Sequence, residues 1–178
     1  KIIGRHGSYH GTTIAAASLT GLPLMHAQFD LPIEGILHTD NPNYYRFGEE
    51  GETETEFADR CIENLEKQIL QEGTDTIGAF FAEPVMGTGG VIVPPDTYFE
   101  KLQKVLKKYD ILLIADEVIC GFGRTGNYWG CETYGIKPDM ITCAKGLSSA
   151  YLPISALLVS EDIYQAMKDG SDKVGIFG

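Results

Sequence analysis

The chain has 178 residues, a formal net charge of −11 at pH 7 and 43% hydrophobic residues, which is typical of one globular domain and excludes a disordered chain. The acidic balance argues against a nucleic-acid partner, because such proteins need a cationic surface to displace counterions. The sequence has no apolar run close to the roughly 18 residues of a membrane span and no signal-peptide pattern, so membrane insertion and secretion are not expected.

A long helix is predicted in the first half of the chain, after a polar loop. Residues 39–56 are rich in turn-forming residues and predict a surface loop. Thr53 and Glu56 have the spacing of a capping box. Apolar residues then recur every four positions, which predicts an amphipathic helix of about four turns, with an inner face of Phe57, Cys61, Leu65 and Ile69.

Strands and helices are predicted to alternate in the rest of the chain. The predicted strands are TIGAFFAE (76–83), ILLIADEV (111–118), DMITCAK (139–145) and ISALLVS (154–160). Between the first two, Asp96 is expected to cap a helix whose inner face holds Phe99, Leu102, Val105 and Leu106. A short helix is expected over about 162–168.

This alternation predicts the fold class. Continuous apolar strands that alternate with amphipathic helices indicate an α/β fold, with a mainly parallel sheet and helices on both faces. In such sheets, ligands bind at the carboxyl ends of the strands. Glu83, Asp116 and Lys145 each fall at or just past such an end. We therefore expect these three ionisable residues to converge on one edge of the sheet.

The four cysteines show neither a C-x-x-C pair nor zinc-ligand spacing with histidine, so no metal site is expected. Cys61 and Cys143 lie in apolar patterns. We interpret Cys61, Cys120, Cys131 and Cys143 as buried reduced thiols, which suits a cytoplasmic protein.

The motif GFGRTG (121–126) matches G-x-G-x-x-G but is predicted to be a glycine-rich turn. A dinucleotide-binding loop needs a helix to start near the third glycine, and the residues after Gly126, NYWGCETYG, make a poor helix start. Arg124 within this motif could bind a carboxylate or form a structural ion pair. It is left outside the predicted site.

Asp116 and Lys145 indicate a catalytic site only when they are considered together. Alone, a carboxylate that ends a strand is usually solvated or caps a helix, and a lysine usually keeps its ammonium in water. Together they are what an enzyme needs when a lysine amine forms a Schiff base with a carbonyl cofactor and an acid keeps that cofactor's ring nitrogen protonated. This combination fits pyridoxal 5'-phosphate.

Four blocks of the sequence, in order, resemble a known family. They are GSYHGTT (7–13), AEPVMGTGGVIVPP (82–95), LLIADEVICGFGRTG (112–126) and PDMITCAKGLSSAYLPISALL (138–158). They are similar to the central blocks of class III, omega-amino acid:pyruvate type aminotransferases, which are fold type I enzymes dependent on pyridoxal phosphate. The resemblance implies that residues 1–178 are the central part of the large cofactor-binding domain. The flanking N- and C-terminal parts would be absent and the piece inactive alone.

The resemblance also implies roles for three residues around the cofactor ring. Lys145 matches the lysine that forms the internal aldimine, and Asp116 matches the aspartate that pairs with the pyridine nitrogen. Val118 lies two residues further along the strand, so it points to the same side as Asp116 and matches the residue that packs against the ring.

Three further residues match positions around the ring. Tyr9 matches the aromatic residue stacked on the opposite ring face, with His10 beside it, and Glu83 matches the acid that supports the site near Asp116. From the residues alone, Tyr9 and His10 could equally be packing or capping residues at a helix start. The family resemblance favours contact with the cofactor.

The implied reaction moves an amino group from an amine or omega-amino acid to a keto acid. Many relatives carry a glutamine where this chain has Ile119, which favours pyruvate over the 2-oxoglutarate used by ornithine and 4-aminobutyrate enzymes. The family resemblance further implies a homodimer when full length. The residues that bind the cofactor phosphate and the substrate carboxylate are expected outside this chain.

Three alternatives stay open. A related class III enzyme, such as an aminomutase or a dialkylglycine-type decarboxylase, would share Lys145 and the same cofactor. A catalytically silent fold type I domain would act as a binding or structural module, although it would need neither Lys145 nor Asp116. A nucleotide-binding dehydrogenase would instead use the glycine motif.

Overall fold

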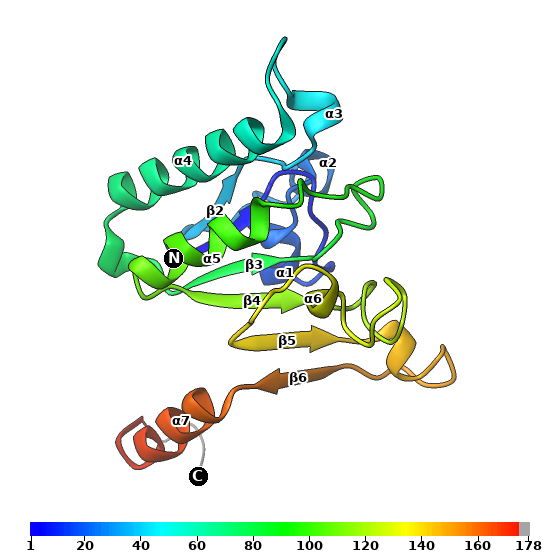
Figure 1. Cartoon of the computed structure of the whole chain (residues 1–178). Helices are drawn as coiled ribbons and strands as arrows, with labels where there is room; N and C mark the ends of the chain where they lie inside the picture. Colours follow the sequence, from blue (N-terminus) through cyan, green and yellow to red (C-terminus); the bar gives the residue numbers. More distant parts are fainter. Residues whose placement is uncertain (175–178) are drawn as a thin grey trace.

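One six-stranded sheet organises the chain in the computed structural model, which describes residues 1–174 (Figure 1). Its strands lie in the order β2–β1–β3–β4–β5–β6. β6 pairs antiparallel with β5, and every other neighbouring pair is parallel. The strands are β1 (Ile2–Arg5), β2 (Ile36–Thr39), β3 (Ala79–Ala82), β4 (Leu112–Asp116), β5 (Met140–Cys143) and β6 (Ala156–Val159). The predicted α/β fold with a mainly parallel sheet is confirmed.

The helices α4 and α5 lie against the sheet, short helices occupy the connections, and α7 follows the last strand (Figure 1). The helices are α1 (Ile14–Leu19), α2 (Pro23–His26), α3 (Tyr44–Phe47), α4 (Glu54–Glu72), α5 (Tyr98–Lys108), α6 (Gly130–Thr133) and α7 (Glu161–Val174), with 3-10 turns η1 (Thr74–Thr76) and η2 (Lys145–Leu147). Within the described residues, none of these helices is long and apolar enough to cross a membrane.

Helices cover both faces of the sheet, as the contacts of two consecutive residues of β1 show. Ile3 belongs to the main apolar core together with residues of α4 and α5. A Cβ on the next residue, Gly4, would lie 2.8 Å from the carbonyl oxygen of Leu19 at the end of α1. Because consecutive strand residues point to opposite faces, α1 covers the face opposite α4 and α5.

The predicted long helix is confirmed as α4. Thr53 accepts a hydrogen bond from the Glu56 amide at 3.3 Å, and the Glu56 carboxylate accepts one from the Thr53 amide at 2.8 Å. This capping box satisfies two amide groups that a helix start leaves without partners. The predicted inner face of Phe57, Cys61, Leu65 and Ile69 is buried.

All four cysteines are buried free thiols, as predicted. Burial raises the pKa of Cys61 to about 12 and that of Cys120 to about 11. These thiols therefore stay protonated at neutral pH and behave as small apolar side chains.

Some boundaries differ from the sequence predictions. Asp96 does not cap α5, which begins at Tyr98 after Thr97 and has no side-chain cap. The Tyr98 amide instead bonds to the Pro95 carbonyl at 2.9 Å, so a turn from Pro95 opens the helix. The last helix, α7, spans Glu161–Val174 and is longer than expected. The sequence analysis does not predict the strands β1 and β2.

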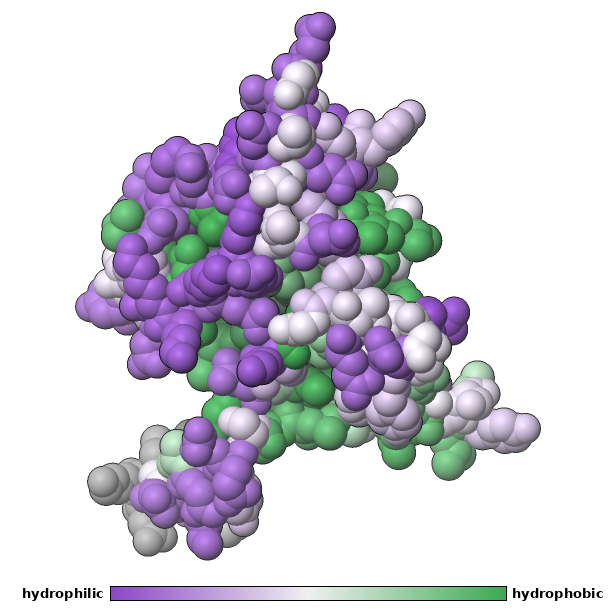
Figure 2. Space-filling view, in the orientation of Figure 1, coloured by the Kyte–Doolittle hydropathy of each residue, from purple (hydrophilic) through white to green (hydrophobic). Residues whose placement is uncertain are grey.

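The last predicted strand forms but is not buried. All four residues of β6 are exposed, and Leu157 keeps 58% of its surface accessible. Figure 2 shows apolar side chains in green near this edge of the sheet. A continuous apolar run predicts burial on both faces, but β6 lies at the edge of the sheet, where its side chains stay exposed.

Leu102 tests the packing of α5. Leu102 has no exposed surface, whereas Leu70 on α4 is 57% exposed. We expect Leu102→Ala to lower the free energy of unfolding by about 2–5 kcal/mol, through lost burial and the cavity left behind. The matched control Leu70→Ala should change it by less than about 0.5 kcal/mol. Denaturant unfolding measures both, and equal losses would contradict the assigned burial.

His38 makes stability depend on pH. Burial lowers the pKa of His38, its hydrogen bond to the Leu19 carbonyl opposes this, and the nearby His6 and His26 lower it further. The unfolded chain therefore takes up this proton more readily than the folded chain. The stabilisation is complete above about pH 6.5, the unperturbed value, and is lost as the pH falls through the folded pKa.

We therefore expect the thermal midpoint to fall between pH 7 and pH 5. His38→Gln keeps a side-chain amide that can donate to the Leu19 carbonyl but removes the titration. This variant should show a shallower fall over the same interval. Identical pH slopes in thermal unfolding of the two proteins would contradict the role of His38.

Candidate active site

The predicted site residues line one hollow of about 300 Å³ at the carboxyl ends of β3, β4 and β5. This volume is at the lower end of the range for small-molecule sites, about 300–1,000 Å³. Larger hollows of about 540 and 750 Å³ lie elsewhere, lined mostly by surface groups. The lining of the site is Tyr9, His10, Gly11, Glu83, Asp116, Val118, Ile119, Ala144 and Lys145.

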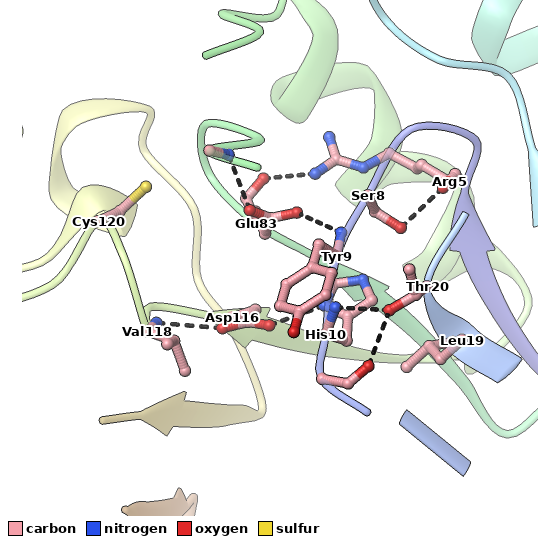
Figure 3. A network of polar contacts seen from close by, with 12 residues as sticks. Arg5, Ser8, Tyr9, His10, Leu19, Thr20, Glu83, Asp116, Val118 and Cys120 are labelled. Atoms are coloured by element: carbon pink, nitrogen blue, oxygen red, sulfur yellow. Dashed lines mark hydrogen bonds and ion pairs between the residues drawn. The ribbon is translucent and has the colours of Figure 1, made fainter. Parts of the chain in front are cut away.

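Asp116 is the last residue of β4 and is 5% exposed. One carboxylate oxygen, Oδ1, accepts a hydrogen bond from the Val118 amide at 3.1 Å. The other, Oδ2, lies 2.7 Å from Nδ1 of His10. Figure 3 shows Asp116 between these two partners. A carboxylate offers about four acceptor positions, so Asp116 keeps capacity for a donor placed in the hollow.

Lys145 enters the same hollow from the end of β5. It is the first residue of η2, and its backbone φ of 37° lies in the left-handed region. A lysine adopts this conformation rarely, and such strain is commonly kept at functional sites. The exposed side chain of Lys145 lines the hollow together with Asp116. An amine and a carboxylate thus meet around one space, as the strand ends predicted.

Glu83 follows β3 and is 3% exposed. Its two carboxylate oxygens accept hydrogen bonds from the amides of Tyr9 at 3.0 Å and Gly87 at 2.9 Å (Figure 3). The Arg5 guanidinium donates to the Glu83 backbone carbonyl. Glu83 thus supports the site by fixing the loop that carries Tyr9.

Glu117 is a buried residue that the sequence analysis did not assign. It has no exposed surface, and its carboxylate accepts hydrogen bonds from the amides of Gly130 at 2.9 Å and Cys131 at 2.6 Å. These bonds hold the start of α6 and hence the loop 119–129 against β4. The sequence did offer one indication of this separate role. Successive residues of a strand point to opposite faces, so Glu117 turns away from the side that Asp116 faces.

The glycine motif forms turns, as predicted, and no helix starts at Gly126. α6 begins only at Gly130 and has four residues. Arg124 donates from Nε to the Ile119 carbonyl at 3.0 Å, and its exposed side chain borders a hollow of about 490 Å³. That hollow shares Lys145 with the site.

The groups that line the hollow fit the pyridoxal cofactor implied by the sequence. The hollow offers an amine that can join an aldehyde and a fixed carboxylate with a spare acceptor position for a ring N–H. Tyr9 supplies an aromatic wall and Val118 an apolar one. A flat, partly apolar heterocycle needs this combination.

Comparison with known proteins identifies a family. The family model for class III aminotransferases matches residues 1–178. Gamma aminobutyrate transaminase 3, chloroplastic, of Solanum lycopersicum is 60% identical over 99% of this chain and 34% of its own length. Gamma aminobutyrate transaminase 1, mitochondrial, of the same plant is 58% identical over the same shares. The chain thus spans about a third of the length of these curated relatives.

Solved structures agree with this similarity. A structure described as a transaminase with L-alanine is 60% identical, with a TM-score of 0.97 over 100% of this chain and 42% of that one. The omega transaminase of Pseudomonas jessenii in complex with PMP is 55% identical. Its TM-score is 0.98 over 100% of this chain and 39% of its own.

Glu117→Gln tests whether Glu117 holds the loop. The amide cannot accept both backbone N–H groups, so one buried donor loses its partner at a cost of about 1–3 kcal/mol. We expect lower stability and faster trypsin cleavage after Arg124, which is exposed in this loop. Glu132→Gln is the control, because Glu132 is exposed and its bond to the Trp129 amide is long, at 3.4 Å. Equal cleavage rates in the two variants would contradict this role of Glu117.

Proposed function

The chain belongs to the class III aminotransferase family, and on this premise we propose that the whole protein is a transaminase dependent on pyridoxal phosphate. The observation that carries the proposal is the single hollow lined by both Lys145 and Asp116. The complex of the Pseudomonas jessenii relative with PMP supports the cofactor, because PMP is the aminated form of pyridoxal phosphate.

Each residue around the hollow has a task in this reaction. When bound, pyridoxal phosphate supplies an aldehyde carbon and a protonated ring that accepts electrons from the substrate carbon. Asp116 would hold the proton at the ring nitrogen, because an anion favours a nearby cation. Tyr9 and Val118 would contact the ring as the aromatic and apolar walls of the hollow. Glu83 keeps Tyr9 in place through the Tyr9 amide.

Lys145 has two tasks. Its amine is the group that would hold the cofactor, through the cofactor's aldehyde. In the reaction, Lys145 Nζ would act as the base that moves the proton of the substrate's amine-bearing carbon. Lys145 has a backbone φ of 37° and lines the same hollow as Asp116.

We propose an omega-amino acid such as 4-aminobutyrate as the donor and pyruvate as the acceptor. The names of the tomato relatives support the donor. The relative solved with L-alanine supports the acceptor, because alanine is the amino acid formed from pyruvate. Ile119 gives the wall an apolar side chain that packs closely on Gly87, where an added Cβ would lie 2.4 Å from Ile119 Cδ1.

We also propose that the whole protein is a homodimer in the cytoplasm. Exposed apolar side chains of the α1–α2 region support a subunit contact, since Ile14 is 69%, Leu24 90% and Phe29 68% exposed. The four free thiols fit a reducing compartment. The names of the two tomato relatives place those proteins in the chloroplast and the mitochondrion.

Substitutions at Lys145 and Asp116 test the function in the whole protein. Borohydride reduction with pyridoxal phosphate and peptide mapping should place the cofactor on Lys145. We expect Lys145→Ala to lose this label and at least about a thousandfold in transamination, because both the anchor and the general base are removed. Asp116→Asn should keep the label but lose about a hundredfold or more in kcat. The exposed Lys137 provides the control, Lys137→Ala, which should behave like the unsubstituted protein.

Several outcomes would reject the proposal. Label on another lysine, or turnover by Lys145→Ala, would make the site assignment wrong. Carbon dioxide released from the amine donor would indicate a decarboxylase, and an isomerised amino acid without a keto acid product would indicate an aminomutase. Failure to bind pyridoxal phosphate at all would favour a non-catalytic domain.

A further inference from the structure

We propose that Phe122 is a positioning residue that acts on Lys145. Its side chain packs against Gly146, the residue next to Lys145, and restrains the backbone from which the lysine amine extends. Phe122 is the aromatic residue of the motif GFGRTG (121–126). This inference rests on the function proposed above.

Phe122 and Gly146 are in tight contact. A Cβ added to Gly146 would lie 2.9 Å from Cδ2, 3.1 Å from Cβ and 3.2 Å from Cγ of Phe122. Rotation of the ring about χ1 would leave the contact with Cβ, because that atom moves only with the backbone. Residue 146 therefore has no room for a side chain, and the missing side chain lets Phe122 reach the backbone next to Lys145.

The backbone of Lys145 depends on support from its surroundings. Its φ of 37° lies in the left-handed region, which is unfavourable for a residue with a side chain and persists only where neighbouring contacts hold it. The amides of Ser148 and Ser149 donate to the Lys145 carbonyl at 3.3 and 3.0 Å. These bonds close the turn η2, but they join residues close in sequence. Phe122 provides a contact from a different segment, the loop after β4.

Phe122 is itself held firmly enough to act as a support. Its φ of 63° is also in the left-handed region, where a bulky residue is an outlier. The preceding residue, Gly121, donates its amide to the Glu117 carbonyl at 2.9 Å. The ring packs against the rings of Tyr128 and Trp129, with centroids 5.6 and 5.2 Å away. The contact thus connects the end of β4 with the segment that follows β5.

The position of Phe122 indicates that it acts through Lys145. Phe122 is not among the residues that line the hollow of about 300 Å³ with Asp116. It lines the neighbouring hollow of about 490 Å³, together with Lys145 and Gly146. Proton transfer requires that Nζ of Lys145 reach one place, and a misplacement of roughly 1 Å can cost about a hundredfold in rate. A restrained backbone limits the positions that Nζ can take.

Three variants of the whole protein test the contact. Phe122→Ala removes Cγ and the ring. Phe122→Leu keeps a Cβ, a Cγ and a Cδ2, the atoms that meet Gly146. Gly146→Ala places a Cβ in the contact, and the φ of Gly146 lies outside the left-handed region, so the alanine adds no backbone strain of its own. Phe47→Ala is the control, because Phe47 is 47% exposed on α3 and lines neither hollow.

The first readout is the kinetics of transamination. We expect Phe122→Ala and Gly146→Ala each to lower kcat by about tenfold to a hundredfold through a misplaced amine. The KM of the amine donor should stay within about threefold, because an interaction that matters only in the reacting state changes kcat and kcat/KM equally. Phe122→Leu and Phe47→Ala should keep kcat within about threefold of the unsubstituted protein. The double variant should lose less than the product of the two single losses, because residues in contact are not independent.

The second readout needs no cofactor. Hydrogen–deuterium exchange, followed by mass spectrometry of the cofactor-free protein, reports on the amides of Ser148 and Ser149, which are bonded in the turn η2. We expect their exchange to be faster by about tenfold in Phe122→Ala and Gly146→Ala, because the restraint on the turn is lost. Exchange in α4 should not change, which distinguishes a loosened turn from a general loss of stability.

Several results would overturn the inference. Unchanged kcat and exchange in Phe122→Ala would show that the turn needs no support from Phe122. Equal losses in Phe122→Ala and Phe122→Leu would assign the effect to the aromatic cluster, and independent losses in the double variant would exclude the contact with Gly146. Equally faster exchange in α4 would reduce Phe122 to a residue of general stability. If the unsubstituted protein binds no pyridoxal phosphate, the proposed function fails, whereas the exchange measurement still decides whether Phe122 holds the turn.

Discussion

The parallel register of β3, β4 and β5 is the constraint on which the site depends. Ala82 pairs with Ala115, and Asp116 pairs with Thr142. Because the strands run in the same direction, their carboxyl ends stop within a residue or two of one another. The residues that follow these ends, together with Asp116 itself, therefore meet around one hollow although they lie far apart in the sequence.

The two carboxylates at the end of β4, Asp116 and Glu117, face opposite sides of the sheet. Asp116 faces the hollow, while the next residue, Glu117, turns away and holds the amides of Gly130 and Cys131. One carboxylate is thus available to a ligand, and the other fixes the loop that forms part of the wall. Both are buried and both are satisfied by hydrogen bonds, which is the condition for keeping charge inside a protein.

The sequence predicted those features that depend on local pattern. The capping box and four-residue period located α4, and the strand ends located Asp116 and Lys145. The pairing of His10 with Asp116 joins residues 106 positions apart, and no local period reports such a contact. The role of Glu117 was likewise hidden, because its partners lie 13 and 14 residues away in a segment without a pattern. Apolar content alone also could not tell an edge strand from a central one.

The open edge of the sheet at β6 affects the solubility of residues 1–178 when they are expressed alone. Among residues 1–174, β6 pairs with a strand on one side only, and its apolar side chains are exposed. An uncovered strand of this kind presents free backbone donors and acceptors on which another chain can build further cross-β structure. Expressed in isolation, residues 1–178 would therefore tend to aggregate through β6. Charged residues placed at Leu157 or Leu158 would be the natural means of keeping such a preparation monomeric.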